Sequence, residues 1–159
     1  MGFKEDHPEF QHLVRELMLL RQHNLGFKDG DPQDGLLFFA EAALVCLSLE
    51  RFVRAVLGAD AGEKDTLYNL LQKGVSKGLI RLPWEDQEEG IKKVSAVRNT
   101  LLHGNYEQAA RDAGCASPAE YFQKQFAGEV ESLFEITDHL VKQIDPETGR
   151  PRPQEGTRS

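Results

Sequence analysis

The sequence has few cysteines, and none of them stands in a metal-binding pattern. Its two cysteines, Cys46 and Cys115, supply neither the paired spacing of a zinc site nor enough thiols for a disulfide framework. Cys46 lies inside an apolar run, where a free and buried thiol is the expected state. Free thiols are typical of a reducing compartment, so we expect a cytoplasmic protein.

No hydrophobic run is long enough to span a membrane. The most apolar stretch, LLFFAEAALVCLSL (36–49), is interrupted by Glu41 and is too short for a hydrocarbon core of about 30 Å. Met1 leads into charged residues rather than a basic start followed by an apolar stretch, which is not the pattern of a secretory signal. We expect no membrane partner, and we expect residues 36–49 to pack in a core or an interface.

Positive charge is also scarce. The chain has 19 lysines and arginines against 26 acids, which gives a net charge of −7. A protein that binds nucleic acid over a broad surface is usually basic, because neutralising phosphates supplies most of the affinity. The composition therefore argues against such a surface. It leaves room for a local basic cleft in residues 91–111, which carry Lys92, Lys93, Arg98 and Arg111 against the single acid Glu107.

Common catalytic and cofactor motifs are missing. The glycine-containing stretch GADAGEKD (58–65) lacks the Gly-Lys-Ser/Thr ending of a phosphate-binding loop, and no Gly-x-Ser-x-Gly pattern occurs. The histidines of the N-terminal region have no metal-ligand spacing to acids. We therefore expect no cofactor and no metal.

Apolar spacing predicts helices, and no convincing strand pattern appears. The expected helices cover 8–24, 36–57 and 63–80, followed by one that carries Ile91, Val94, Val97 and Leu101 and by one that begins at SPAE (117–120) and reaches Ile144. The predicted fold is an all-α, up-and-down bundle of four long helices plus a short fifth. Residues 1–145 form a single domain in this prediction, and the Pro-, Gly- and charge-rich residues 146–159 form a disordered tail.

Arg98 is the unusual residue of the predicted fourth helix, because it projects from an apolar stripe beside Val94 and Leu101. A guanidinium cannot lose its charge there, so it needs a carboxylate, a partner chain or an anionic ligand. Glu41 and Glu50 occupy similarly apolar surroundings in the helix over 36–57. Either carboxylate could neutralise Arg98.

His103 follows Arg98 by five residues, which is about 140° around an ideal helix. Gly104 is typical of a residue just beyond a helix end, and Asn105 with Gln108 can begin a new short helix. If the chain turns there, His103 can swing back beside Arg98. In the simpler structural interpretation, Arg98 belongs to an interhelical ion pair and His103 caps a helix.

The stretch RNTLLH (98–103) resembles the signature of the HEPN superfamily, the higher eukaryotes and prokaryotes nucleotide-binding domain. That signature is an arginine, usually followed by a polar residue, and then a histidine after four to six intervening positions. Here these are Arg98, Asn99 and His103. SLERFVRAVLG (48–58) looks like the acid-bearing helix that precedes the motif, with Glu50 as the acid. The similarity covers residues 8–145 by architecture, but its specific part is six residues long.

The resemblance implies a metal-independent endoribonuclease of the toxin or defence type that works as a homodimer in the cytoplasm. His103 would be the general base or acid, Arg98 would hold the scissile phosphate, Asn99 would orient the phosphate or the histidine, and Glu50 would position Arg98. The candidates for further RNA contacts are Lys92, Lys93, Tyr106 and Arg111. An antitoxin or another protein from the same operon is a possible partner.

One departure and one alternative accompany this resemblance. Toxins of the branch neutralised by nucleotidyltransferases typically have a tyrosine two residues after the histidine, where this chain has Asn105, and Tyr106 comes one residue later. HEPN-like bundles also serve as non-catalytic binding or dimerisation modules. The acidic net charge favours a protein partner of that kind over RNA.

Overall fold

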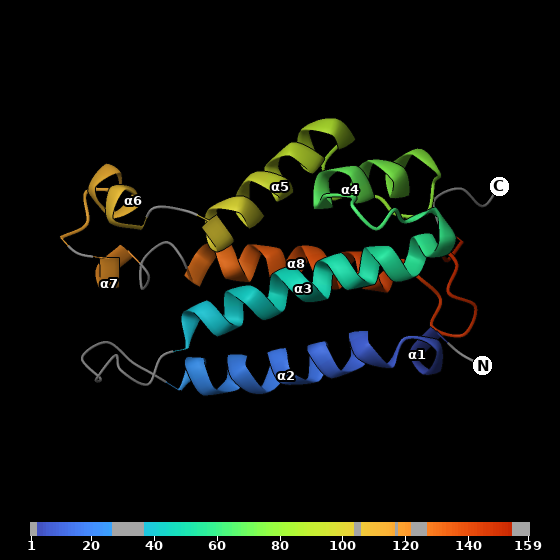
Figure 1. Ribbon diagram of the computed structural model, residues 1–159, viewed down its shortest axis with the longest axis horizontal. Coiled ribbons are helices and arrows are strands. Elements are labelled where there is room, and N and C mark those ends of the chain that lie inside the picture. The colour runs from blue at the N-terminus through green and yellow to red at the C-terminus, as the bar shows by residue number, and fades with distance from the viewer. Residues whose placement is uncertain (1–2, 27–36, 104–105, 117, 122–126, 154–159) are drawn as a thin grey trace.

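The computed structural model of the chain is built of helices (Figure 1) and describes residues 3–26, 37–103, 106–116, 118–121 and 127–153. In chain order the helices are α1 (Phe3–Asp6), α2 (Pro8–Leu25), α3 (Phe38–Leu57), the short 3-10 helix η2 (Gly58–Asp60), α4 (Leu67–Ser76), α5 (Gln87–His103), α6 (Tyr106–Asp112), α7 (Pro118–Tyr121) and α8 (Ala127–Lys142). These ranges contain no β-strand, only an isolated bridge between Ile144 and Pro151. The predicted all-α class is confirmed. No helix within them is both long and apolar enough to cross a bilayer.

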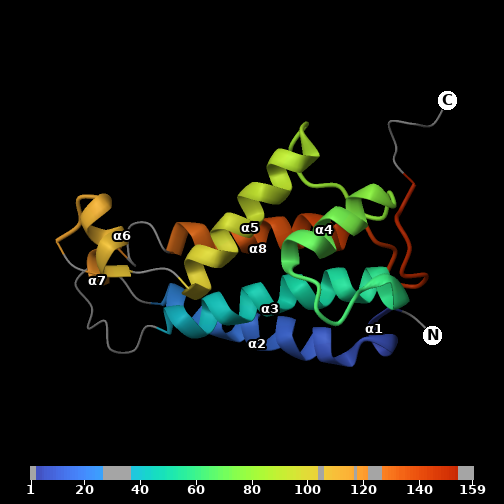
Figure 2. The same cartoon turned by 45° about the horizontal axis from the view of Figure 1, so that its top comes forward.

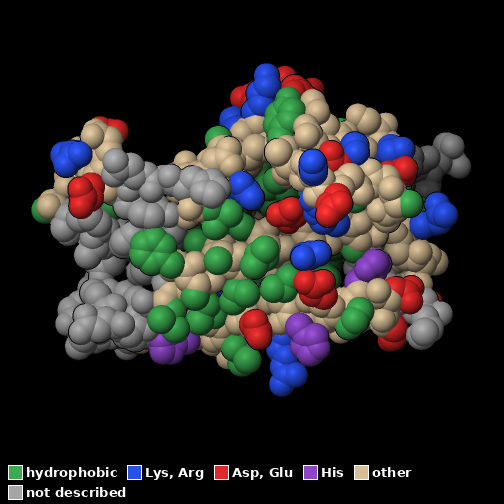
Figure 3. All heavy atoms as spheres, in the orientation of Figure 1, with side chains coloured by type: hydrophobic (Ala, Val, Ile, Leu, Met, Phe, Trp, Pro, Cys, Tyr) green, Lys and Arg blue, Asp and Glu red, His purple; other side chains and the backbone are tan. Residues whose placement is uncertain are grey.

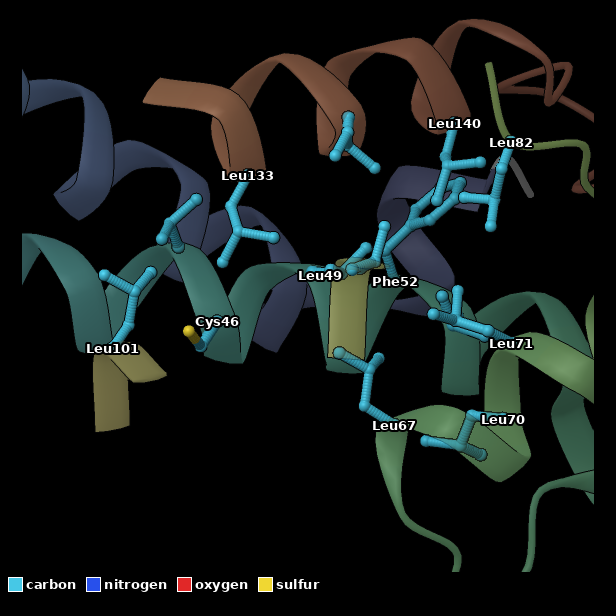
Figure 4. Packing of buried hydrophobic residues seen from close by; sticks show 14 of the residues in the cluster. Cys46, Leu49, Phe52, Leu67, Leu70, Leu71, Leu82, Leu101, Leu133 and Leu140 are labelled. Carbon is cyan, nitrogen blue, oxygen red and sulfur yellow. The ribbon is translucent and has the colours of Figure 1, made fainter. Parts of the chain in front are cut away.

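The central helix of the bundle is α3, against which α2, α4, α5 and α8 all pack. Its residues Val45, Leu49 and Phe52 have no exposed surface. Figure 4 shows Phe52 beside Leu140 of α8, and the Phe52 ring lies 5.4 Å from the Phe10 ring of α2, measured between centroids. The nearly continuous apolar sequence of α3 follows from this position, because a helix with neighbours on most sides leaves little surface for water.

The helix expected over 63–80 is shorter in the structure, where α4 covers Leu67–Ser76. Arg54 of α3 holds the preceding segment in a loop, donating from Nη1 to the Gly62 carbonyl oxygen over 2.8 Å and from Nη2 to the Asp65 carbonyl oxygen over 3.0 Å. Thr66 then caps α4 by accepting a hydrogen bond from the Asn69 amide. At the other end, Gly78 takes a φ of +70°, which ends the helix because few side chains tolerate that conformation.

The helix predicted from 117 to Ile144 includes residues 117 and 122–126, which lie outside the described part of the chain. The described segments of that helix are α7 and α8, and α7 packs beside α6 beyond the end of the bundle (Figures 1 and 2). Beyond α8, residues 145–152 form a turn in which the Arg152 amide donates to the Gln143 carbonyl over 2.7 Å and the Asp145 amide donates to the Arg150 carbonyl over 2.8 Å. These backbone hydrogen bonds order a segment that composition alone assigns to a tail, whereas residues 154–159 lie outside the described part.

Arg21 of α2 joins three helices. Its Nη2 lies 2.6 Å from Glu131 of α8, its Nη1 lies 3.8 Å from Glu41 of α3, and its guanidinium stacks over the Phe134 ring at 3.8 Å. The amide of Asn24 also donates to the Glu41 carboxylate. Burial raises the pKa of Glu41 from its ordinary value of 4.5, although the Asn24 hydrogen bond and the Arg21 charge act in the opposite direction. The ionised Glu41 is therefore held at a net cost in free energy.

The pH dependence of stability tests this cost. Because the folded protein binds the Glu41 proton more tightly than the unfolded chain does, the free energy of unfolding falls as the pH rises from 4.5 through the raised pKa. Glu41→Gln removes this contribution, so its stability relative to wild type should increase as the pH rises from about 4 to about 7. Urea unfolding at several pH values measures the difference. Glu135→Gln, at an exposed position of α8, makes the same substitution away from the buried Arg21–Glu41 contact and is the matched control.

Candidate functional site

The motif recognised in the sequence lies in the second half of α5, whose start is anchored by the segment before it. The Gln87 side chain donates to the Leu82 carbonyl and accepts from the Leu82 amide, and the Asp86 carboxylate accepts from the Glu89 amide. Ile91, Val94 and Leu101 are then buried against the bundle. This packing fixes the rotation of α5 and hence the directions in which Arg98 and Asn99 leave the helix.

Arg98 is half-buried, and its Nη1 donates to Oδ1 of Asn99 over 3.2 Å. The charge of Arg98 also affects the pKa of the buried Cys46 thiol of α3. Figure 4 shows Cys46 beside Leu101 of α5. Burial raises the pKa of Cys46 to about 12, while Arg98 acts to lower this pKa and Glu50 acts to raise it. The thiol therefore stays protonated at neutral pH.

The ion pair expected between Arg98 and either Glu41 or Glu50 is not formed. Glu41 is held by Arg21 and Asn24 at the interface of α2 and α3. Glu50 pairs with Arg54, one turn further along α3, at 3.3 Å. Within the described ranges, no carboxylate lies within 4.0 Å of Arg98. The physical reason is that each acid has an arginine closer at hand, on its own helix or on α2.

His103 is the last residue of α5. The helix continues unbroken from Arg98 to His103, so these two backbone positions remain about 140° apart around the axis. The turn that was expected to bring them together would begin at Gly104 and Asn105, which lie outside the described residues, as do the side chains of His103 and Tyr106. Asn99, by contrast, precedes His103 by four residues, and residues four apart share a face of a helix.

Among the candidate RNA-contacting residues, the described side chains of Lys92, Lys93 and Arg111 are distributed over two helices. Lys92 is exposed on the second turn of α5, and Lys93 beside it pairs with Glu89 at 3.1 Å. Arg111 lies on α6 and donates to Gln108 over 3.0 Å. About 15 Å of helix separates Lys93 from the end of α5, and α6 lies beyond that end (Figure 1). Among the described residues, no group of three or more potential ligands could hold a metal ion.

Sequence patterns alone did not single out Arg21, the arginine that holds Glu41. It follows Leu17 by four residues and precedes Asn24 by three, so it stands on the stripe of α2 that is buried at Leu17 and Asn24. This is the same kind of signal that singled out Arg98. Arg21 and Arg98 both stand on apolar helix faces, and either could pair with the buried Glu41. The packing of α2 against α3 places Arg21 beside it.

No family model matches the chain, and neither a curated protein nor a solved structure is significantly similar to it. The resemblance of residues 98–103 to the HEPN signature therefore rests on the motif and on the helical architecture.

The contrast between Arg98 and Arg21 gives a test of what each arginine does. Arg98→Ala should change the free energy of unfolding by less than about 1 kcal/mol, because no buried carboxylate loses its partner. Arg21→Ala should lower it by about 3–5 kcal/mol, because it leaves the buried Glu41 without its cation. Thermal or urea unfolding of the two variants beside wild type measures both values. Equal losses for the two would mean that Arg98 is also a structural residue.

Proposed function

We propose that the protein is a metal-independent endoribonuclease of the HEPN type. The observation that carries the proposal is the Arg98 guanidinium, which is half-buried near the end of α5 and has no carboxylate partner in the part of the chain that the structure describes. Such a group favours an anion, and its planar fork suits two oxygens of a phosphate. The motif histidine follows on the same helix.

The proposed reaction uses the 2′-hydroxyl of RNA as its nucleophile. His103 acts as general base or general acid, either accepting the proton of the 2′-hydroxyl or supplying one to the leaving oxygen. The 2′-oxygen bonds to phosphorus, the bond from phosphorus to the 5′-oxygen breaks, and the 5′-oxygen takes up a proton. Arg98 stabilises the charge that grows on the phosphate oxygens. The products are a 2′,3′-cyclic phosphate and a 5′-hydroxyl.

Asn99 and Glu50 have supporting parts in this proposal. Asn99 accepts a hydrogen bond from Arg98 and occupies the helix face of position 103, so it can orient either the guanidinium or the bound phosphate. Glu50 acts on the site through its charge rather than by direct contact with Arg98, since its carboxylate is engaged by Arg54. An RNA strand that extends along α5 and α6 beyond the scissile phosphate would contact Lys92, Lys93, Tyr106 and Arg111.

A cleavage assay in EDTA tests the activity. Wild-type protein should cut structured or single-stranded RNA to cyclic phosphate ends and leave DNA of the same sequence intact, because DNA lacks the 2′-hydroxyl. His103→Ala should lower the rate by about 10²-fold or more, since general acid–base catalysis contributes about that much. Arg98→Ala should be similarly impaired. His139→Ala, at an exposed position of α8, is the matched histidine control and should retain the wild-type rate.

Absence of cleavage, or equal cleavage by wild type and His103→Ala, would overturn the catalytic proposal. The chain would then be better described as a non-catalytic helical binding module.

We propose further that the protein acts as a homodimer, with α3 at the contact. Phe39 and Leu47 of α3 are 56% and 44% exposed, and Leu102 of α5 is 36% exposed. Figure 3 shows hydrophobic side chains gathered over α3 on the face toward the viewer. A large contiguous apolar patch on a protein surface marks an interaction site, and the exposed residues of α3 would contribute to one. A second copy placed there would lie close to the helix that carries Arg98.

Light scattering on a sizing column tests the dimer. Wild type should elute with the mass of two chains, and Leu47→Glu should elute as one chain, because a charge buried in an apolar contact has no partner. Asn69→Glu adds the same charge at an exposed position of α4 and should leave the mass unchanged. A wild-type protein with the mass of one chain at micromolar concentration would contradict the proposal.

A further inference from the structure

A groove of about 590 Å³ opens on the bundle away from α5, with α2 and α8 as its walls and α3 as its floor. This volume lies within the range of about 300–1,000 Å³ that is typical of small-molecule sites. The lining is predominantly apolar and comes from successive turns of the two wall helices: Phe10, Val14, Met18, Phe134, Val141 and, on the floor, Phe52. None of the lining residues belongs to α5 or α6, so this groove is separate from the Arg98 site.

One polar group at the floor of the groove has no hydrogen-bond partner. Ser48 of α3 is fully buried and lines the groove, yet its hydroxyl makes no hydrogen bond to any described residue. A serine inside a helix can usually donate to the carbonyl four residues earlier. Thr137 on the wall does this, donating to the Leu133 carbonyl over 2.8 Å. A buried hydroxyl without a partner costs about 1–3 kcal/mol, and a polar atom of a bound molecule would remove that cost.

The edge of the groove is basic, although the chain as a whole carries a net charge of −7. The ionisable residues that line it are Arg15, Lys142 and Arg152, with Asp138 as the one acid. Asp138 is already paired with Lys142 at 2.7 Å. Arg15 and Arg152 form no ion pair with any residue in the described ranges. Two unpaired guanidinium groups therefore stand at the mouth of an apolar groove.

We infer that this groove binds a small anionic amphiphile, with its carboxylate or similar anionic group between Arg15 and Arg152 and its apolar body between α2 and α8. The Ser48 hydroxyl has no exposed surface in the unbound structure, so a polar oxygen along that body pairs with it by displacing the side chains that cover it. An amphipathic helix from a protein partner fits less well, because its apolar side chains would cover the groove and leave the Ser48 hydroxyl unpartnered.

Calorimetric titration of the full-length protein with dodecanoate tests the anionic and apolar requirements together. Dodecanoate should bind one molecule per chain, and dodecyltrimethylammonium, with the same tail and the opposite charge, should bind about ten-fold more weakly or not at all. The double variant Arg15→Glu with Arg152→Glu should weaken dodecanoate binding by about ten-fold. The matched control, Lys64→Glu with Arg81→Glu, makes the same change of charge at exposed positions outside the groove and should stay within about two-fold of wild type.

A second probe isolates the role of Ser48. The ligand 12-hydroxydodecanoate carries a hydroxyl at the end of the chain that enters the groove. The ratio of its affinity to that of dodecanoate should fall by about five-fold in Ser48→Ala, the usual effect of losing one hydrogen bond. Failure of dodecanoate to bind, equal binding of the cationic probe, equal weakening by the control variant, or an unchanged ratio in Ser48→Ala would each overturn the inference. None of these results depends on ribonuclease activity.

Discussion

The position of α3 at the centre of the bundle is the constraint on which the other features depend. Four helices pack against α3, so its buried polar side chains are shielded from water. Each of them therefore needs a hydrogen-bond or ion-pair partner from a neighbouring residue. Glu41 is satisfied by Arg21 and Asn24 of α2, together with the contact of Arg21 to α8. Glu50 is satisfied within α3 by Arg54, which also holds the loop that leads into α4. Ser48 is satisfied by nothing that the structure describes.

The pairing of Glu41, the pairing of Glu50 and the lack of a partner for Ser48 explain the two candidate sites, at Arg98 and at the groove. Because the two acids of α3 pair with other arginines, the Arg98 guanidinium on α5 has no carboxylate partner within the described ranges, and its charge acts on the protonated Cys46 thiol. The groove between α2 and α8 is lined by Ser48, whose buried hydroxyl has no hydrogen-bond partner among the described residues, and by Arg15 and Arg152, which form no ion pair with those residues. Both proposals place an anionic group beside arginine side chains, although the chain carries a net charge of −7. The two sites lie on different sides of the bundle and can be tested independently.

The sequence anticipates much of the fold and part of the candidate site. Apolar periodicity predicts α2 and α3 to within two residues at either end, because burial of one helix face imposes the 3.6-residue period directly. The same periodicity predicts α4 too long at both ends. The Thr66 cap and the hydrogen bonds from Arg54 to the Gly62 and Asp65 carbonyls limit its start, and neither feature produces a periodic pattern in the sequence. The same limit applies to Arg98: the sequence shows its apolar surroundings, but it does not show that none of the carboxylates in the described part of the chain pairs with it.

The amino-acid sequence is enough to establish the helical class, the burial of α3 and the presence of an arginine and a histidine near the end of one helix. These follow from local periodicity and composition, which each segment carries whatever its neighbours are. The packing of the helices, by contrast, sets which arginine pairs with which acid, which described hydroxyl is left without a partner, and how the basic residues of 91–111 are distributed over α5 and α6. Those outcomes depend on distances between side chains far apart in the chain, and such distances are set by how the helices pack against α3.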